Sequence, residues 1–290
     1  MRRPREGGAQ IQVITIDAHQ HFWDPQRGDY GWLTRELPHF YRVFAPEDLR
    51  HELVECEVQG TVLVQAAPTE AECGYLLEIA DRTPWVLGVV GWLDLRAQDA
   101  CERIRAWAGR RKLVGVRPML QDLQDISWVT SEACVPAFRT LADMDLTFDA
   151  LIRVPQFPTI AALAAANPGL RIVVDHAAKP DITRAERTTW LTAMRALAKH
   201  PNVACKYSGL LSEAAPGAGG HELRFYSEAL LEIFGPERLL WGSDWPILTG
   251  VSDYGSWIAM ARELVAHVPG AARAGIMGRN AIAFYGLDAG

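Results

Sequence analysis

The sequence has 290 residues and a formal net charge of -6, and 49% of its residues are hydrophobic. This length and composition are typical of a folded chain that forms one large α/β domain or two small ones. The acidic balance argues against nucleic acid as a main partner, because binding to phosphates needs a basic surface. The apolar runs are as long as strands and fall far short of the roughly 20 residues that a membrane span requires.

The start of the chain is basic, but it lacks the features of an export signal. The apolar run behind it is short, alternates with polar residues and has no small-residue cleavage site. We expect residues 1–10 to form a tail and residues 11–290 to form the folded domain. The five cysteines are odd in number and form no Cys-x-x-Cys pair, which is typical of a reducing compartment and predicts a cytoplasmic protein. Oligomeric state leaves no signal in the sequence.

The first predicted strand leads into two histidines, His19 and His21. A run of β-formers over residues 11–16 precedes them, and Asp24-Pro25 stops any regular element after them. In an extended chain, residues i and i+2 point to the same side, so both imidazoles would face one point. The exit of a buried parallel strand is where α/β folds place their chemistry. The alternative is an ordinary histidine pair that is satisfied by local hydrogen bonds.

A long aromatic connection, residues 22–44, follows the histidines. It contains Tyr30, Trp32 and Tyr41 and is interrupted by prolines. Loops of this length are usually functional or disordered, and the aromatic content argues against disorder. We therefore expect this loop to take part in the site.

Eight strand-length apolar segments alternate with helical patterns along the chain. The predicted strands lie at residues 11–16, 60–68, 86–94, 113–118, 146–152, 170–177, 202–209 and 238–246. The predicted helices lie at about residues 46–57, 69–81, 98–109, 131–143, after 158, 184–200 and 221–234, with two more at the end. Continuous apolar strands are typical of a parallel sheet that is buried on both faces. Eight such units predict one (β/α)8 TIM barrel of the α/β class. A doubly wound open sheet is the alternative, disfavoured by the even spacing and by the lack of Gly-x-Gly-x-x-Gly after the first strand.

Polar residues end most of the predicted strands. Besides the two histidines they are Gln65, Trp92, Arg117, Asp149, His176, Lys206 and Asp244. Buried charges cost several kcal/mol unless they are paired. Core packing alone therefore does not explain why so many strands end in polar or charged residues. Together these residues predict a site at the mouth of the barrel.

Each of these residues also has a structural interpretation. His176 could be a satisfied core histidine, and Asp149 could cap the next segment. Arg117 and Lys206 could brace carboxylates inside the barrel. Asp244 is the strongest functional candidate, because residues 242–246, Gly-Ser-Asp-Trp-Pro, place a carboxylate on a tight strand end that a proline terminates.

Four blocks at these strand ends resemble the amidohydrolase superfamily. They are Asp17-Ala18-His19-Gln20-His21, Val174-Asp175-His176-Ala177-Ala178-Lys179-Pro180, Cys205-Lys206-Tyr207-Ser208-Gly209 and Leu240-Trp241-Gly242-Ser243-Asp244-Trp245-Pro246. More closely they resemble its sugar lactonase branch, which includes L-fuconolactonase and L-rhamnonolactonase and is related to pyrone dicarboxylate lactonase. The resemblance runs from about residue 14 to residue 285 and includes the segments 114–118 and 278–285.

The resemblance implies a barrel that hydrolyses a cyclic ester. It also implies that His19, His21 and Asp244 bind a divalent metal and that the aspartate takes the proton of the attacking water. The sequence departs from members with two metals, because Arg117 stands where the fourth strand would end in lysine and no histidine ends the fifth strand. At most one metal ion, such as Zn²⁺, is therefore expected, and a reaction without metal stays open.

The predicted hydrolase is thus a lactonase of carbohydrate metabolism whose substrate is a small sugar lactone. Asp244 would activate water, and His19, His21 and His176 would polarise the carbonyl. The expected substrate-binding residues are Arg117, Lys206, Trp32, Trp92, Gln65, Trp245 and Tyr30. The tryptophans would pack against the C–H faces of a sugar ring, although each could equally belong to the core.

Three alternatives stay open from the sequence. A lactone isomerase would move the acyl group to another hydroxyl of the same sugar acid. A metal-dependent decarboxylase of the same superfamily would need an essential metal and an acidic substrate. A binding protein that has lost the chemistry is the least favoured, since the histidines and Asp244 are all present.

Overall fold

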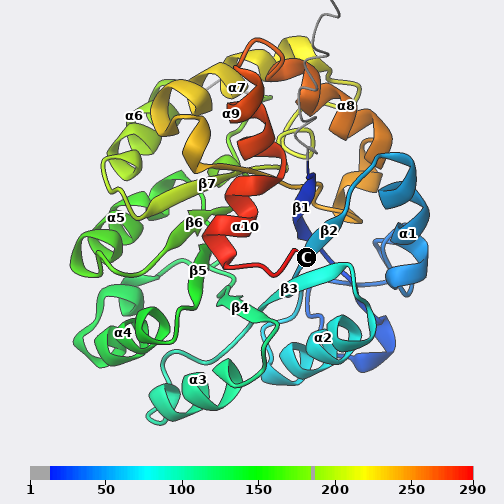
Figure 1. Ribbon diagram of the computed structural model, residues 1–290. Helices are drawn as coiled ribbons and strands as arrows, with labels where there is room; N and C mark the ends of the chain where they lie inside the picture. The colour runs from blue at the N-terminus through cyan, green and yellow to red at the C-terminus, as the bar shows by residue number, and fades with distance from the viewer. Residues whose placement is uncertain (1–13, 184–186, 290) are drawn as a thin grey trace, which may run out of the picture.

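Eight parallel strands follow one another in chain order around a barrel (Figure 1). They are β1 (Ile16–Gln20), β2 (Gly60–Val64), β3 (Val86–Gly91), β4 (Leu113–Val116), β5 (Thr147–Ala150), β6 (Ile172–Val174), β7 (Val203–Tyr207) and β8 (Leu239–Trp241). The computed structural model describes residues 14–183 and 187–289, so the expected tail over residues 1–10 lies outside the described part. The predicted (β/α)8 barrel is confirmed.

Helices surround the barrel (Figure 1). They are α1 (Pro46–Glu55), α2 (Glu70–Arg82), α3 (Ala100–Ala108), α4 (Val135–Asp143), α5 (Phe157–Ala166), α6 (Arg187–Ala198), α7 (Gly220–Phe234), α8 (Tyr254–Leu264), α9 (Gly270–Ala274) and α10 (Asn280–Tyr285). Short 3-10 turns are Pro25–Arg27, Ser127–Thr130, Glu132–Cys134, Val154–Gln156, Asp175–Ala178, Pro236–Arg238 and Ile247–Gly250, and Gly275–Arg279 forms a π turn. The first three residues of the helix predicted at 184–200 lie outside the described part. Within the described residues, no helix is both long and apolar enough to span a bilayer.

Residues 11–13 of the strand predicted at 11–16 lie outside the described part, and within the described residues the strand extends further along the chain than predicted. β1 begins at Ile16 and runs through Asp17, His19 and Gln20, all of which are fully buried. Side-chain hydrogen bonds compensate for the burial of these polar residues: Gln20 Nε2 donates to Thr61 Oγ1 at 3.1 Å, although Gln20 Oε1 has no partner among the described residues. The strand therefore carries the first histidine itself, and His21 follows directly at its exit.

The apolar interior of the barrel is closed at one end by the C-terminal helix. The interior residues include Ile16, Val62, Val90, Val173 and Leu240, and they form one buried cluster with Ala281, Tyr285 and Leu287. Figure 1 shows α10 crossing this end of the barrel. Because the strands begin at this end, the opposite end, where they finish, stays available for a site.

The barrel closes where the segment after β8 meets β1. Asp244 N donates to His19 O at 2.8 Å, and His21 N donates to Trp245 O at 2.7 Å. The closure therefore places Asp244 and both histidines of the first block next to one another through backbone hydrogen bonds.

Asp17 reinforces this closure from inside the wall. Its Oδ1 accepts from Ser243 N at 2.8 Å, and its Oδ2 accepts from Ser243 Oγ at 2.6 Å and from Tyr254 Oη at 3.0 Å. Its Oδ1 also accepts from His19 N at 3.1 Å. One fully buried carboxylate thus ties β1, the loop after β8 and α8 together.

We predict that Asp17→Asn lowers the free energy of unfolding by about 2 to 4 kcal/mol, because the amide leaves buried donors without an acceptor. Urea unfolding followed by circular dichroism measures this loss. Asp288→Asn, at a site whose side chain is 76% exposed, serves as the matched control and should change the free energy by less than about 0.5 kcal/mol. Equal stability of Asp17→Asn and wild type would contradict the closing role.

Candidate active site

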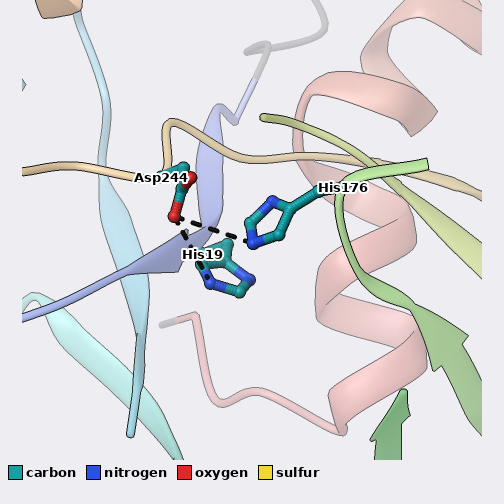
Figure 2. A group of neighbouring side chains, drawn as sticks. All are labelled: His19, His176 and Asp244. Atoms are coloured by element: carbon teal, nitrogen blue, oxygen red, sulfur yellow. Dashed lines mark ion pairs between the residues drawn. The ribbon is translucent and has the colours of Figure 1, made fainter. Parts of the chain in front are cut away.

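Three histidines and Asp244 converge at the carboxyl ends of the strands. Asp244 Oδ1 lies 3.4 Å from His21 Nε2, 3.7 Å from His19 Nε2 and 3.7 Å from His176 Nε2. All four residues are at most 5% exposed. Figure 2 shows His19, His176 and Asp244 pointing toward one another from three different segments of the barrel. The convergence expected from the sequence is therefore present.

A cavity of about 240 Å³ opens beside this cluster. Its lining comprises His21, Trp23, Trp32, Ala66, Arg117, Met119, Gln121, Asp122, Leu151, His176, Lys179, Asp244 and Ile247. This volume suits a ligand the size of one sugar ring. A larger cavity of about 660 Å³ lies near Thr15, where β1 begins. Sites of (β/α)8 enzymes lie at the carboxyl ends of the strands, which favours the smaller cavity.

The histidines of the first block have partners that assign their tautomers. Lys206 Nζ lies 2.9 Å from His19 Nδ1 and, as an ammonium, can only donate. Arg117 Nη1 faces the other ring nitrogen, Nε2, at a longer 3.4 Å. The shorter contact with Lys206 therefore places the proton of neutral His19 on Nε2, which lies 3.1 Å from His21 Nε2. His21 Nδ1 lies 2.7 Å from Val64 O and must donate to it, so His21 Nε2 keeps its lone pair.

His176 stands on a strained left-handed turn after β6. Residues His176, Ala177, Ala178 and Lys179 have φ angles of 52°, 51°, 56° and 50°. Such conformations cost non-glycine residues of order 1 to 3 kcal/mol each and persist where the surroundings enforce them. Gly209, itself at φ 67°, packs so closely that a Cβ there would lie 2.7 Å from His176 Cβ. The turn and this glycine fix the direction of the imidazole.

Asp244 also has a left-handed backbone, with φ 61°. Its carboxylate is buried, and burial works against ionisation, yet the nearby imidazoles of His176, His21 and His19 hold the pKa of Asp244 well below its ordinary value. The site therefore presents an ionised carboxylate against a group of imidazoles. That is the form a general base needs.

A network of buried charges lies behind His19. Lys206 Nζ lies 2.6 Å from Asp149 Oδ2 and 3.0 Å from Asp175 Oδ1, and all three side chains are fully buried. Asp175 Oδ2 accepts from Arg117 Nη1 at 3.2 Å, and Asp149 Oδ2 accepts from Tyr285 Oη at 2.7 Å. Although burial opposes its charge, the cation of Lys206 holds the pKa of Asp175 well below the ordinary value. Asp149 thus pairs with a lysine and caps no helix.

The structure places two of the expected substrate-binding residues at the cavity. Trp32 lines it, with its Nε1 donating to Ala66 O at 2.8 Å. Arg117 also lines it, with its terminal nitrogens donating to Asp175 and to Gln65 O. Arg117 Nε is buried without a hydrogen-bond partner among the described residues, so it remains a donor for a ligand.

The other expected substrate-binding residues lie away from the cavity lining. Lys206 is fully buried in the charge network, and Gln65 Nε2 donates to Arg117 O. Trp245 packs in the core against Phe22 and Phe44, at ring-centroid distances of 5.9 and 5.3 Å. Tyr30 is 6% exposed, and neither it nor the half-buried Trp92 lines the cavity. Contact of these five residues with substrate stays a prediction without geometric support.

Sequence reasoning missed several residues of the lining. They are Trp23, Met119, Gln121, Asp122, Leu151, Lys179 and Ile247. Lys179 carried a signal, because it lies three residues after His176 in a block already selected. Trp23, Met119, Gln121 and Asp122 stand on loops, where no periodicity indicates the direction of a side chain. Leu151 is one more apolar residue of the strand predicted at 146–152, and Ile247 begins a 3-10 turn.

The residues of the cluster fit one divalent cation. His19, His176 and Asp244 each offer a ligand atom, and these atoms lie within 4.8 Å of one another. Neutral imidazoles and an ionised carboxylate are ligands for zinc. The set contains His176 in place of the expected His21, and ligation through His19 Nε2 requires the proton on that atom to move.

Burial lowers the pKa of all three histidines. The pKa of His176 falls to about 4 from 6.5, and desolvation outweighs the favourable charges of Asp244 and Asp175. The pKa of His19 and that of His21 are also lowered, again mainly by burial. All three imidazoles are therefore neutral near pH 7.

These shifts predict that the protein loses stability as the pH falls. Between pH 6.5 and 4 the unfolded chain binds a proton at His176 that the folded state does not, so stability rises with pH in this window. From about pH 7 to pH 5 the loss is roughly 2 kcal/mol for His176 alone. Urea unfolding at both pH values measures it. His176→Asn should flatten the dependence, and His267→Asn, at an exposed site, should leave it unchanged; identical slopes in both variants would contradict the prediction.

Comparison with known proteins agrees with this geometry. The family model described as amidohydrolase matches residues 16–287. The chain is 44% identical over 280 residues to a Burkholderia ambifaria protein named L-fucono-1,5-lactonase, covering 95% of this chain and 97% of that one. It is 34% identical to a Burkholderia multivorans protein of the same name, with 95% and 97% covered.

Solved structures of amidohydrolases also resemble this chain over almost its whole length. A crystal structure of an amidohydrolase from Burkholderia multivorans with bound zinc has a TM-score of 0.89 and 32% identity, covering 95% of this chain and 100% of that one. A second crystal form of an amidohydrolase from that organism, with bound HEPES, gives the same values. With eight strands, three converging histidines and Asp244 in place, the chain belongs to the amidohydrolase family.

Proposed function

We propose that this protein hydrolyses a sugar lactone, with L-fucono-1,5-lactone as the first candidate substrate. The observation that carries the proposal is the convergence of Asp244 with His19, His21 and His176 beside a cavity of about 240 Å³. The relatives named L-fucono-1,5-lactonase, which the chain matches along almost its whole length, support this substrate class.

Asp244 acts as the general base. Its ionised carboxylate takes a proton from water while the water oxygen attacks the lactone carbonyl carbon. The developing oxyanion is stabilised by donors already in place, of which Arg117 Nε is the candidate. Preorganised donors of this kind are each worth about 2.7 to 4 kcal/mol in a buried site.

The ring then opens when the bond between the acyl carbon and the ring oxygen breaks. The departing alkoxide takes the proton back from Asp244, which restores the carboxylate. The products are a hydroxyl group and a carboxylic acid on one open chain, and the acid ionises near pH 7. Each turnover therefore releases one proton.

When a divalent cation is held by His19, His176 and Asp244, it supplies Lewis-acid polarisation of a carbonyl. The chain's own residues also provide donors for this polarisation. A lactone carbonyl needs less polarisation than an amide carbonyl. The amide nitrogen stabilises its carbonyl more strongly than a ring oxygen does, and an amine is a poorer leaving group. Arg117 and Lys206 are only 3% and 0% exposed, and their charges are paired with the carboxylates of Asp175 and Asp149.

We also propose the cytoplasm as the compartment. The five cysteines of the chain, all within the described residues, are free thiols, which supports a reducing environment.

Asp244→Asn tests the role of the base. We expect kcat to fall by about 100-fold to 10,000-fold with the fold intact, since an amide cannot accept the proton from water. Turnover of L-fucono-1,5-lactone is measured by proton release, and circular dichroism checks the fold. Asp81→Asn, at an exposed ion pair with Arg110, is the matched control and should keep wild-type kcat. Near-normal kcat in Asp244→Asn would exclude the general-base role.

A panel of lactones, assayed with and without chelator, tests the substrate class and separates the alternatives. We expect six-membered sugar lactones to be hydrolysed. A rate that chelator leaves unchanged would assign the reaction to the buried donors alone. Loss of activity that Zn²⁺ or Mn²⁺ restores would assign an essential metal. Release of carbon dioxide from an acidic aromatic substrate would favour the decarboxylase, and conversion of one lactone into another without proton release would favour the isomerase.

A further inference from the structure

The left-handed turn after β6 presents two side chains to the cavity. Lys179 N donates to His176 O at 2.8 Å and closes the turn, while Trp190 Nε1 donates to Ala177 O at 2.8 Å and anchors it. Ala177 and Ala178 are fully buried in the core. His176 and Lys179, at the two ends of the turn, both line the cavity. Residues 176–179 thus all adopt an unfavourable left-handed backbone, and this turn places Lys179 beside the cluster of histidines and Asp244.

Lys179 keeps its hydrogen-bonding capacity. Among the described residues its ammonium makes one ion pair, in which Nζ lies 3.6 Å from Glu213 Oε1, and no hydrogen bond. Its side chain is 20% exposed, so it is neither locked in the core nor free in solvent. Lys206, by contrast, contacts Asp149, Asp175 and His19 within 3.0 Å. Lys179 is therefore the lysine of the site that can still bind a ligand.

Glu213 holds this ammonium loosely from the segment after β7. Its other carboxylate oxygen lies 3.5 Å from Arg153 Nη1, so one carboxylate is shared between two cations. Arg153 does not line the cavity. Glu213 therefore positions the Lys179 ammonium but leaves its hydrogen-bond donors free for a ligand. Arg153, which shares Glu213 with Lys179, can serve as a control residue.

The chemistry of ring opening calls for such a cation. Hydrolysis converts a neutral lactone into a carboxylate, and this carboxylate forms next to the ionised Asp244. Like charges at close range disfavour each other unless a cation lies between or beside them. Of the two cationic side chains that line the cavity, Arg117 already donates through both terminal nitrogens to Asp175 and Gln65 O.

We propose that Lys179 is a substrate-binding residue whose ammonium binds the acyl oxygens of the lactone and stays with them as they become the product carboxylate. This inference rests on the proposed function and deepens it, because it assigns a recognition residue for a ligand whose charge changes during the reaction. The left-handed turn links this residue rigidly to His176, so both act on the same acyl group.

Lys179→Met tests the assignment, since methionine has an unbranched side chain and makes the same demand on the left-handed backbone. We expect the Kd for L-fuconate, measured by calorimetry, to rise about tenfold or more, because a charge-assisted hydrogen bond is lost. The KM for L-fucono-1,5-lactone should also rise, by a larger factor than kcat falls. Lys179→Arg should keep the Kd within about threefold. Thermal unfolding checks that the variants fold, and calorimetry on Lys179→Arg gives a second readout should methionine destabilise the turn.

Two controls separate direct contact from indirect effects. Lys199→Met removes the same charge from an exposed site and should leave Kd and KM unchanged. Arg153→Met removes the other cation on Glu213 and should also leave them unchanged. A Kd for Lys179→Met within twofold of wild type would overturn the inference, as would an equal loss in Arg153→Met, which would place the effect in the Glu213 segment. If wild type hydrolyses no lactone, the proposed function fails, whereas the calorimetric comparison still decides the role of Lys179; no binding of L-fuconate by wild type would overturn that role.

Discussion

The candidate active site is built around one buried ammonium. Lys206 Nζ lies within 3.0 Å of Asp149, Asp175 and His19, and no part of the side chain reaches solvent. A buried cation is tolerated when carboxylates surround it, and breaking such a pair costs several kcal/mol. Because the ammonium can only donate, it also decides which nitrogen of His19 carries the proton. Lys206 thus both balances the charges of the buried carboxylates and fixes the position of the proton on His19.

The barrel is layered along its axis by polarity. The helix α10 and the apolar side chains of the strands fill the end where the strands begin. The charged side chains of Lys206, Asp149 and Asp175 form the next layer. Tyr285, at the end of α10, contacts this layer because its Oη donates to Asp149 Oδ2. The imidazoles and Asp244 lie above, beside the cavity. Water is excluded from below, so the donors of the site act in a medium where hydrogen bonds to a developing charge are strong.

Most of the left-handed non-glycine residues that the structure describes lie at the candidate site. The residues 176–179 and Asp244 are non-glycine residues in the left-handed region, and Gly209 and Gly242 make room beside His176 and His19. A Cβ on Gly242 would lie 2.9 Å from His19 Cβ. Strained backbone persists only where surrounding contacts over-determine it, and here these contacts also orient His176 and Asp244. The strained residues lie at the strand exits, where they set the directions of the His176 and Asp244 side chains.

The sequence by itself determined the eight alternating units, the spacing of His19 and His21 and the strand ends that carry His176 and Asp244, because periodicity and strand-stopping residues are local properties. The tertiary structure decided which polar strand ends face the cavity and which brace the core. Arg117 and Lys206 looked alike in the sequence, and both are buried and contact His19, yet only Arg117 lines the cavity. The contact between Lys206 and His19 spans 187 positions of the chain. A contact of that range depends on how the barrel closes, and no local pattern records it.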